Sequence, residues 1–438
     1  MNDLLTPWQP TATDPFDLVK VGHLLRRAGF GGSLTQRRQL EQAGVTAAIA
    51  QLAGVATPAP PDETLLQDAI AFGDIERVRA FRVWLAQNAQ QPLTQRVSYF
   101  WHGHFATSNT KLNDPRAMAL QLATFDRLGL ARFDELLAAL CRDPALLRWL
   151  DNDVNTKAKP NENFARELFE LFALGRGNYS EADIREAARC FTGWHVRDGQ
   201  FFFHARLHDD GDKALFGKSG RLTGDDVVAA TVARRESAEF LADRWLRFFV
   251  HPEPERAEID ALAAVYEQTG RDVRATLTTL LASKLFFAPR ALRAKVKSPA
   301  DFVLGFVRAL GARAAPVELA ATMASLGETW CEPPSVEGWH GERAWLSPAS
   351  WLLRVNFVAD LLSGRTGKLA PDPERSFKRA EKPAEFARIA ALLLLDGALR
   401  KEDAERLADV AAAHGADTRA AAHAVLHAAA CLPEYQLA

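Results

Sequence analysis

The sequence lacks an excess of either charge and lacks a long apolar run. Its 438 residues carry 53 Lys and Arg against 55 Asp and Glu, a formal net charge of −2. This balance excludes a broadly basic nucleic-acid-binding protein and an acidic solvating tail. The longest apolar candidates, Ile389–Leu395 and Ala420–Leu432, are too short or interrupted by His423 and His427, whereas a membrane helix needs roughly 20 apolar residues. We therefore expect no membrane span and no nucleic-acid partner.

Cysteine is also scarce. The four cysteines lie far apart and form no CxxC pair (Cys141, Cys190, Cys331 and Cys431). They are typical of buried thiols in a reducing compartment. The opening residues, MNDLLTPWQP, lack the basic stretch followed by an apolar stretch that marks a secretory signal. Together these absences predict a cytoplasmic protein.

Helix-forming segments with capping residues are abundant. Asp143-Pro144 places a capping carboxylate before a proline, and Ser180 and Ser298 each precede an Asp by three residues, as at helix starts. One β-hairpin is predicted at 194–204, because Asp198-Gly199 favours a two-residue turn. The pairing that this turn imposes places one set of side chains on the core face (Trp194, Val196, Phe201 and Phe203) and brings His195 and His204 into diagonal proximity on the other face.

The predicted fold is mainly α. We expect one large multi-helix domain over residues 1–364, which contains the hairpin. A polar linker over 365–383 and a C-terminal helical subdomain over 384–438, packed on the main body, follow it. The linker contains a basic run, Arg375–Lys382, which we interpret as a solvated surface.

The most informative polar segment is 150–175, LDNDVNTKAKPNENFARELFELFALG. A loop rich in Asp and Asn leads into a helix that is predicted to start near Pro160 and to end at Gly175. In this helix Glu162 and Arg166 are spaced for an i,i+4 ion pair. Because buried carboxylates and amides are costly without partners, the polar face of this helix needs one.

The same loop has the spacing of a helix–loop–helix calcium site. Asp151, Asp153 and Asn155 would supply oxygen ligands, and Glu162 stands at the twelfth position. The sixth position, however, is Thr156 where such sites have glycine. A capped polar loop before a helix is therefore the favoured interpretation.

Two histidines lie close together in WHGHF, residues 101–105. If the helix ends at Gly103, His102 and His104 converge and supply two imidazoles to a divalent metal. If the whole stretch is helical, the two side chains point roughly 200° apart and cannot share a metal ion. A third polar stretch follows the hairpin, where His208 and Asp209 together are suited to a metal ligand or a general base.

Eight segments, in the right order over nearly the whole chain, resemble a large bacterial family catalogued as domain of unknown function 1800. They are HLLRRAGFG (23–31), FWHGHFATS (100–108), WLDNDVNTKAKPNENFARELFELFALG (149–175), YSEADIREAARCFTGW (179–194), LHDDGDKALFG (207–217), KSPADFV (297–303), EPPSVEGW (332–339) and PEYQLA (433–438). The resemblance implies frequent export and frequent encoding beside a sulfatase-like family, number 1501. The family's motif positions fall here on His102, His104, Asn161, Glu162, Asn163, Arg166, Glu167, His208 and Asp209.

Two hypotheses of function follow. In the first, the chain is a metal-assisted hydrolytic enzyme. A divalent metal would be bound by His102 and His104, catalysis would be carried by Glu162, Glu167 and His208, and substrate would be bound by Asn161, Asn163, Arg166 and Asp209. In the second, the chain is a non-catalytic helical binding or assembly protein, and a partner of the co-encoded sulfatase-like protein. The polar motifs would then be hydrogen-bond networks that fix helix packing.

Overall fold

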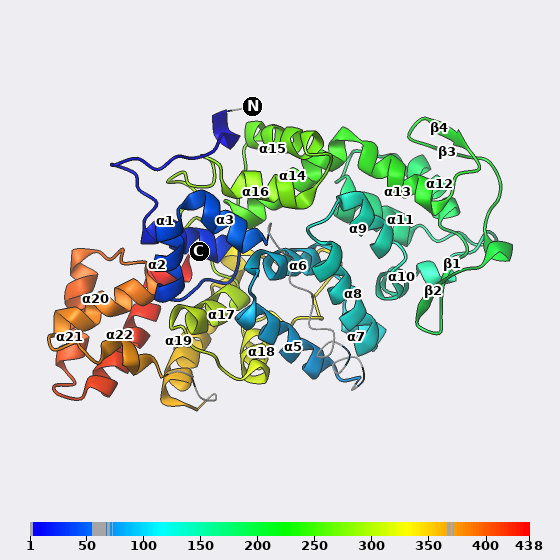
Figure 1. The fold of residues 1–438 in the computed structure, drawn as a ribbon. Helices are drawn as coiled ribbons and strands as arrows, with labels where there is room; N and C mark the ends of the chain where they lie inside the picture. Colours follow the sequence, from blue (N-terminus) through cyan, green and yellow to red (C-terminus); the bar gives the residue numbers. More distant parts are fainter. Residues whose placement is uncertain (1–2, 55–66, 68–70, 72, 366–368, 370–371) are drawn as a thin grey trace.

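A computed structural model describes the chain except for residues 1–2, 55–66, 68–70, 72, 366–368 and 370–371. Helices dominate, and the strands of the described residues form two small antiparallel sheets of two strands each (Figure 1). The predicted mainly α fold is confirmed. No helix among the described residues is long and apolar enough to cross a membrane.

The elements follow one another along the chain. The first part contains α1 (Leu18–Arg27), α2 (Leu34–Ala43), α3 (Val45–Ala53), α5 (Ile75–Asn88), α6 (Pro92–His104), α7 (Asn109–Leu112), α8 (Pro115–Leu128), α9 (Phe133–Leu140), α10 (Pro144–Trp149), α11 (Asn163–Glu167) and α12 (Glu181–Cys190). Two hairpins come next, β1 (Trp194–Arg197) with β2 (Gln200–Phe203), and β3 (Lys213–Leu215) with β4 (Lys218–Gly220). The last part contains α13 (Gly224–Ala233), α14 (Arg235–Phe249), α15 (Arg256–Gln268), α16 (Val273–Leu281), α17 (Pro299–Ala309), α18 (Pro316–Ser325), α19 (Pro348–Ser363), α20 (Pro383–Leu394), α21 (Lys401–Ala412) and α22 (Thr418–Ala430).

The predicted helix starts are confirmed by their caps. The Asp143 carboxylate accepts a hydrogen bond from the Leu146 backbone N–H at 2.9 Å, and Ser298 accepts one from the Asp301 N–H at 3.1 Å. Ser180 and its partner three residues on form a complete capping box. These contacts are local in sequence, which is why the sequence predicts them well.

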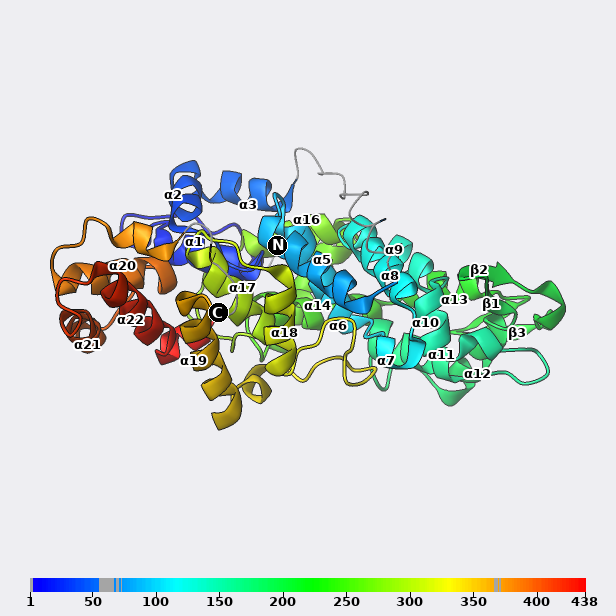
Figure 2. The same cartoon turned by 90° about the horizontal axis from the view of Figure 1, so that it is seen from below.

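The predicted hairpin is present with the predicted register, Trp194 opposite Phe203. The rings of His195 and His204 lie 6.2 Å apart on one face, as expected. The core face differs from the prediction at Phe203, which is 45% exposed although Trp194, directly opposite, is buried. The hairpins lie at one tip of the elongated molecule (Figures 1 and 2). Trp194 packs against Phe191, which directly follows α12, whereas Phe203 meets only the ring of His208, at 5.3 Å, among the described aromatic rings.

Two hydrophobic clusters form the interior. The first gathers apolar side chains mainly from α1–α16, and the second joins α17–α22 with part of α5. Helices α20–α22 lie at the end of the molecule opposite the hairpins (Figures 1 and 2). These C-terminal helices share one cluster with α17–α19, and the separate subdomain over 384–438 stays a prediction, since part of the linker lies outside the described residues.

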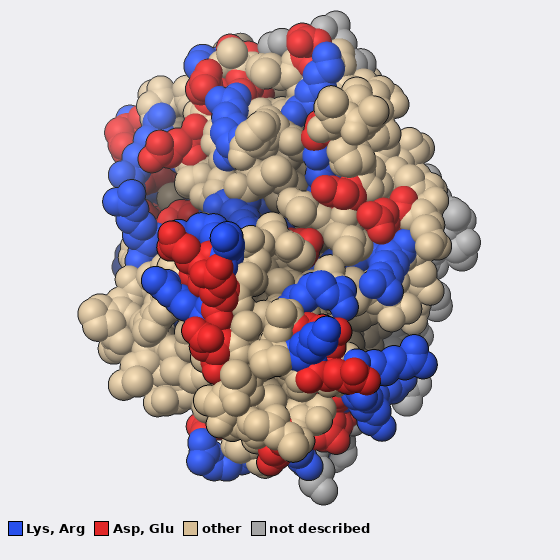
Figure 3. Space-filling model, turned by 90° about the vertical axis from the view of Figure 1, so that its left-hand side faces the viewer, with Lys and Arg blue, Asp and Glu red and all other residues tan. Residues whose placement is uncertain are grey.

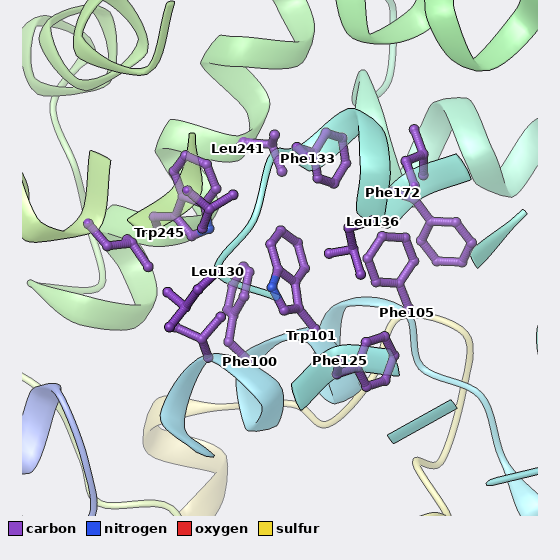
Figure 4. Packing of buried hydrophobic residues seen from close by; sticks show 14 of the residues in the cluster. Phe100, Trp101, Phe105, Phe125, Leu130, Phe133, Leu136, Phe172, Leu241 and Trp245 are labelled. Carbon is purple, nitrogen blue, oxygen red and sulfur yellow. The ribbon is translucent and has the colours of Figure 1, made fainter. Parts of the chain in front are cut away.

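Helix α6 is anchored in the first cluster through Trp101. Its indole ring stacks on Phe133 with ring centres 5.7 Å apart, and the indole N–H donates to the Gly129 carbonyl at 2.9 Å. Figure 4 shows this ring surrounded by aromatic and leucine side chains from several helices. Because Trp101 fixes the rotation of α6, it also fixes the directions in which His102 and His104 leave the helix.

Candidate functional site

The two histidines of WHGHF diverge. The whole stretch to His104 belongs to α6, which is the case in which the sequence excludes a shared metal ion. The Nε2 atom of His102 accepts a hydrogen bond from the Cys331 backbone N–H at 2.9 Å. The Nε2 atom of His104 lies 2.9 Å from the Phe172 carbonyl oxygen and donates to it. Each imidazole therefore holds a different segment against α6.

Both imidazoles are buried and neutral. Burial lowers the pKa of His102 to about 3, and nearby Arg82 adds to the effect. Burial also lowers the pKa of His104 to about 3, assisted by Arg244. Since the Nε2–H of His104 is used as a donor, its Nδ1 carries a lone pair. That Nδ1 has no hydrogen-bond partner within the described chain.

Phe172 belongs to a π-helical segment, Leu168–Ala173, which continues α11. The sequence predicts an ordinary helix here. The last carbonyls of a helix lack partners within it, and His104 supplies one for Phe172. The 150–175 segment and WHGHF do meet at this point, through a backbone carbonyl and not through the predicted carboxylates.

The asparagines of the 150–162 loop form a buried network. The Asn155 amide group donates to the Ala188 carbonyl at 2.9 Å and to the Asn152 side chain at 3.0 Å, and its oxygen accepts from the Asn161 N–H at 2.9 Å. Asn163 donates to the Leu150 carbonyl at 3.1 Å. The buried side chain of Asn155 fixes the loop against α12, whereas Asn163 is exposed.

The predicted charged residues at and before α11 are partly exposed. Arg166 pairs with Glu162 at 3.2 Å, which confirms the i,i+4 spacing, and with Glu181 at 2.8 Å. Glu167 is half-buried, and burial together with Glu170 raises its pKa. No ion pair or hydrogen bond joins its carboxylate to another described residue.

The stretch after the hairpin packs on α12. His208 is buried, and its Nδ1 bonds to the Thr192 carbonyl oxygen at 2.8 Å. The Asp209 carboxylate accepts from the Arg189 guanidinium at 2.8 Å, which helps hold the pKa of Asp209 below its usual range. Both residues are engaged in local packing.

The predicted metal set does not converge. Among the residues that the structure describes, no three His, Cys, Asp or Glu side chains lie where they could hold one metal ion. The calcium-like loop has its Asn155 in the amide network and its Asp151 paired with Lys111 at 2.6 Å. The donors therefore do not fit a divalent metal.

A cleft of about 290 Å³ lies elsewhere, between the two hydrophobic clusters; we call it the central cleft. One wall is α6 and another is α14. The third wall is the segment 295–301, which leads into the first turn of α17. The fourth wall is the irregular segment 327–347, which we call the strap. The lining residues are Arg96, Tyr99, Phe100, Gly103 and His104, then Arg244, Arg247 and Phe248, then Lys295, Val296, Ser298 and Asp301, and finally Glu337, Trp339, Gly341, Glu342 and Trp345.

Three of the segments that carry the family resemblance meet in this cleft. FWHGHFATS supplies His104, KSPADFV supplies Ser298 and Asp301, and EPPSVEGW supplies Glu337 and Trp339. His104 is therefore the one predicted site residue that lines the cleft. The volume of the central cleft, about 290 Å³, lies near the lower limit of ordinary ligand pockets, about 300–1,000 Å³.

The strap is held against α6 by close backbone packing. Gly338 has a φ of +84°, and a Cβ at this position would lie 2.4 Å from the Gly103 carbonyl oxygen. Trp339 meets the ring of His102 edge-on at 5.2 Å. Lys295 pairs with Glu342 of the strap and donates to the Arg247 carbonyl at 2.6 Å. The strap is therefore a built wall of the cleft.

Most charges in the cleft are paired. Burial favours the neutral form of Asp301, but Arg96, at 2.5 Å, and Arg27 hold its pKa below the usual value. Burial lowers the pKa of Lys295 to about 8, opposed by Glu342. Arg247 pairs with Asp243 at 2.8 Å. Among the described residues, these pairs include every cation of the cleft lining except one.

That cation is Arg244. Burial lowers its pKa, as does Arg247 nearby, while Asp243 and Glu337 act in the opposite direction at longer range. Its guanidinium lies 5.7 Å from the Phe240 ring centre, and no ion pair or hydrogen bond ties it to the rest of the described residues. A guanidinium stays charged in proteins, so its partial desolvation is costly unless an anion joins it.

Arg244 and Arg247 are not among the site residues predicted from the sequence. The segment 240–250, FLADRWLRFFV, predicts a buried helix, and about half of the residues of α14 are buried. The available signal was Arg244 and Arg247 inside an otherwise apolar segment, since buried cations need partners.

Comparison with known proteins identifies a family. The sequence profile of a family described as "Protein of unknown function (DUF1800)" matches residues 23–437. No curated protein matches the chain, and no solved structure does.

Proposed function

Because the chain belongs to the DUF1800 family, whose description names no activity, we propose a function from the central cleft itself: the protein binds a small organic acid there. This places it in the second class inferred from the sequence, a helical binding protein. The observation that carries the proposal is Arg244, a partly buried guanidinium that lines an aromatic cleft without a carboxylate partner among the described residues.

The chemistry of the lining defines the ligand. A carboxylate suits the planar guanidinium of Arg244, which offers two parallel N–H donors. The buried Nδ1 of His104 has no partner among the described residues, and we propose that a hydroxyl group of the ligand donates a hydrogen bond to it. Tyr99, Phe100, Phe248, Trp339 and Trp345 give apolar walls suited to a ring. A hydroxy acid that carries a ring combines all three features.

Binding measurements with three related probes test this proposal. Mandelate carries a carboxylate, a hydroxyl and a ring, phenylacetate lacks the hydroxyl, and mandelamide lacks the charge. Mandelate is expected to bind most tightly by calorimetry. Arg244→Gln is expected to remove the preference for mandelate over mandelamide, while Arg343→Gln, an exposed strap residue outside the lining, keeps it. Absence of saturable binding, or equal loss in both variants, would refute the proposal.

A further inference from the structure

A second hollow of about 280 Å³ lies between α2, the 3-10 segment Pro373–Phe377 and α20. It shares no lining residue with the central cleft. Its floor is aliphatic and includes Leu34 and Ile389, and its rim carries Arg38, Arg379 and Arg388. We call it the arginine hollow. None of the segments that carry the family resemblance lines it.

The three rim arginines come from three separate stretches and are exposed. No ion pair or hydrogen bond joins any of their guanidinium groups to another described residue. The neighbouring Arg37 shows the contrast, because it is buried and pairs with Asp396 at 2.7 Å. Arg379 belongs to the basic run that the sequence assigns to solvated surface, and the fold brings it to the same hollow as Arg38.

One carboxylate lines the hollow, that of Glu385. It accepts hydrogen bonds from the backbone N–H groups of Glu381, at 2.7 Å, and Lys382, at 3.2 Å, at the start of α20. These bonds lower its pKa, so Glu385 stays ionised and tied to the helix start. Three positive side chains against one negative leave the hollow with a net positive charge.

The surrounding surface is not broadly basic. On the end of the molecule shown in Figure 3, Lys and Arg side chains are mixed with Asp and Glu. Such a surface favours a small anion over an extended polyanion. Three guanidinium groups at one site suit the oxygens of a phosphate group, and the aliphatic floor suits an apolar organic part.

We propose that the arginine hollow binds a phosphate monoester with an apolar organic group, held by Arg38, Arg379 and Arg388 above the floor of Leu34 and Ile389. The proposal is independent of the organic acid in the central cleft, because the two sites share no residue.

Calorimetry on the full chain tests the proposal with hexyl phosphate as the probe. Hexyl phosphate is expected to bind more tightly than inorganic phosphate, and 1-hexanol is expected not to bind. Arg38→Gln and Arg388→Gln should each weaken hexyl phosphate binding about tenfold, as expected for loss of a charged hydrogen bond. Arg375→Gln is the matched control, since Arg375 is exposed in the same 3-10 segment but does not line the hollow.

Three results would overturn it: no saturable binding of hexyl phosphate, equal weakening by Arg375→Gln, or binding that Arg244→Gln abolishes and Arg38→Gln leaves intact. The last result would move the anion to the central cleft. Vesicles of phosphatidylcholine with phosphatidic acid test whether the ligand is a lipid headgroup and not a free ester. If the protein binds these vesicles but does not bind hexyl phosphate, the proposal is also contradicted.

Discussion

The contact between Gly338 and Gly103 gives a sharp test of the central cleft, because it joins the strap to α6. At Gly338, φ is +84° and an added Cβ would lie 2.4 Å from the Gly103 carbonyl oxygen. A positive φ costs a residue with a side chain about 1–2 kcal/mol, and overpacking typically adds about 1–3 kcal/mol. Gly338→Ala is therefore expected to lower the free energy of unfolding by about 2–5 kcal/mol.

Urea unfolding measures this loss, and hydrogen exchange of the peptide over 327–347 shows whether the strap itself loosens. Gly341→Ala is the matched control in the same strap, since Gly341 has a φ of −87° and its added Cβ would meet only the Trp345 ring at 3.9 Å. Equal stability and equal strap protection in the two variants would show that the strap does not pack on α6 as described, and the cleft would lose one wall.

Three further predictions concern buried polar groups. Burial raises the pKa of Glu328 to about 7 from 4.5, so ionisation of this group should cost about 3 kcal/mol of stability as pH rises from 4.5 to 7; in urea unfolding across this pH range, stability should fall by about 3 kcal/mol less for Glu328→Gln than for the wild type. Asn155→Ala should cost about 3 kcal/mol or more by leaving buried partners unpaired, unlike Lys157→Ala in the same loop, and added calcium should leave the wild-type Tm unchanged. Glu167→Gln should raise the Tm at pH 7 but not at pH 4, because the raised pKa of this carboxyl means that its ionisation destabilises the fold; a lowered Tm at pH 7 would show an unseen partner.

The sequence predicts the elements better than the site, for a physical reason. Caps such as Ser298 and the Asp198-Gly199 turn depend on contacts within a few residues, so their residue types reveal them. The central cleft joins α6, α14, the start of α17 and the strap, which lie up to some 250 residues apart along the chain. No local sequence pattern indicates that these segments come together. The π-helical turn at Leu168–Ala173 has no local signal either, since its residues suit an ordinary helix.

The WHGHF motif shows how a pattern that suggests metal chemistry serves packing instead. A spacing of two residues on an α-helix sends side chains to opposite sides, so the motif gives α6 two anchors. His102 accepts a hydrogen bond from the strap and His104 donates one to the π-helical segment. The acceptor role of His102 needs a neutral imidazole, which burial ensures. Between them, the Gly103 carbonyl group comes close to Gly338, which has no Cβ to clash with it. The motif thereby brings two separate segments against α6, and His104, which lines the central cleft, keeps a buried Nδ1 without a partner among the described residues.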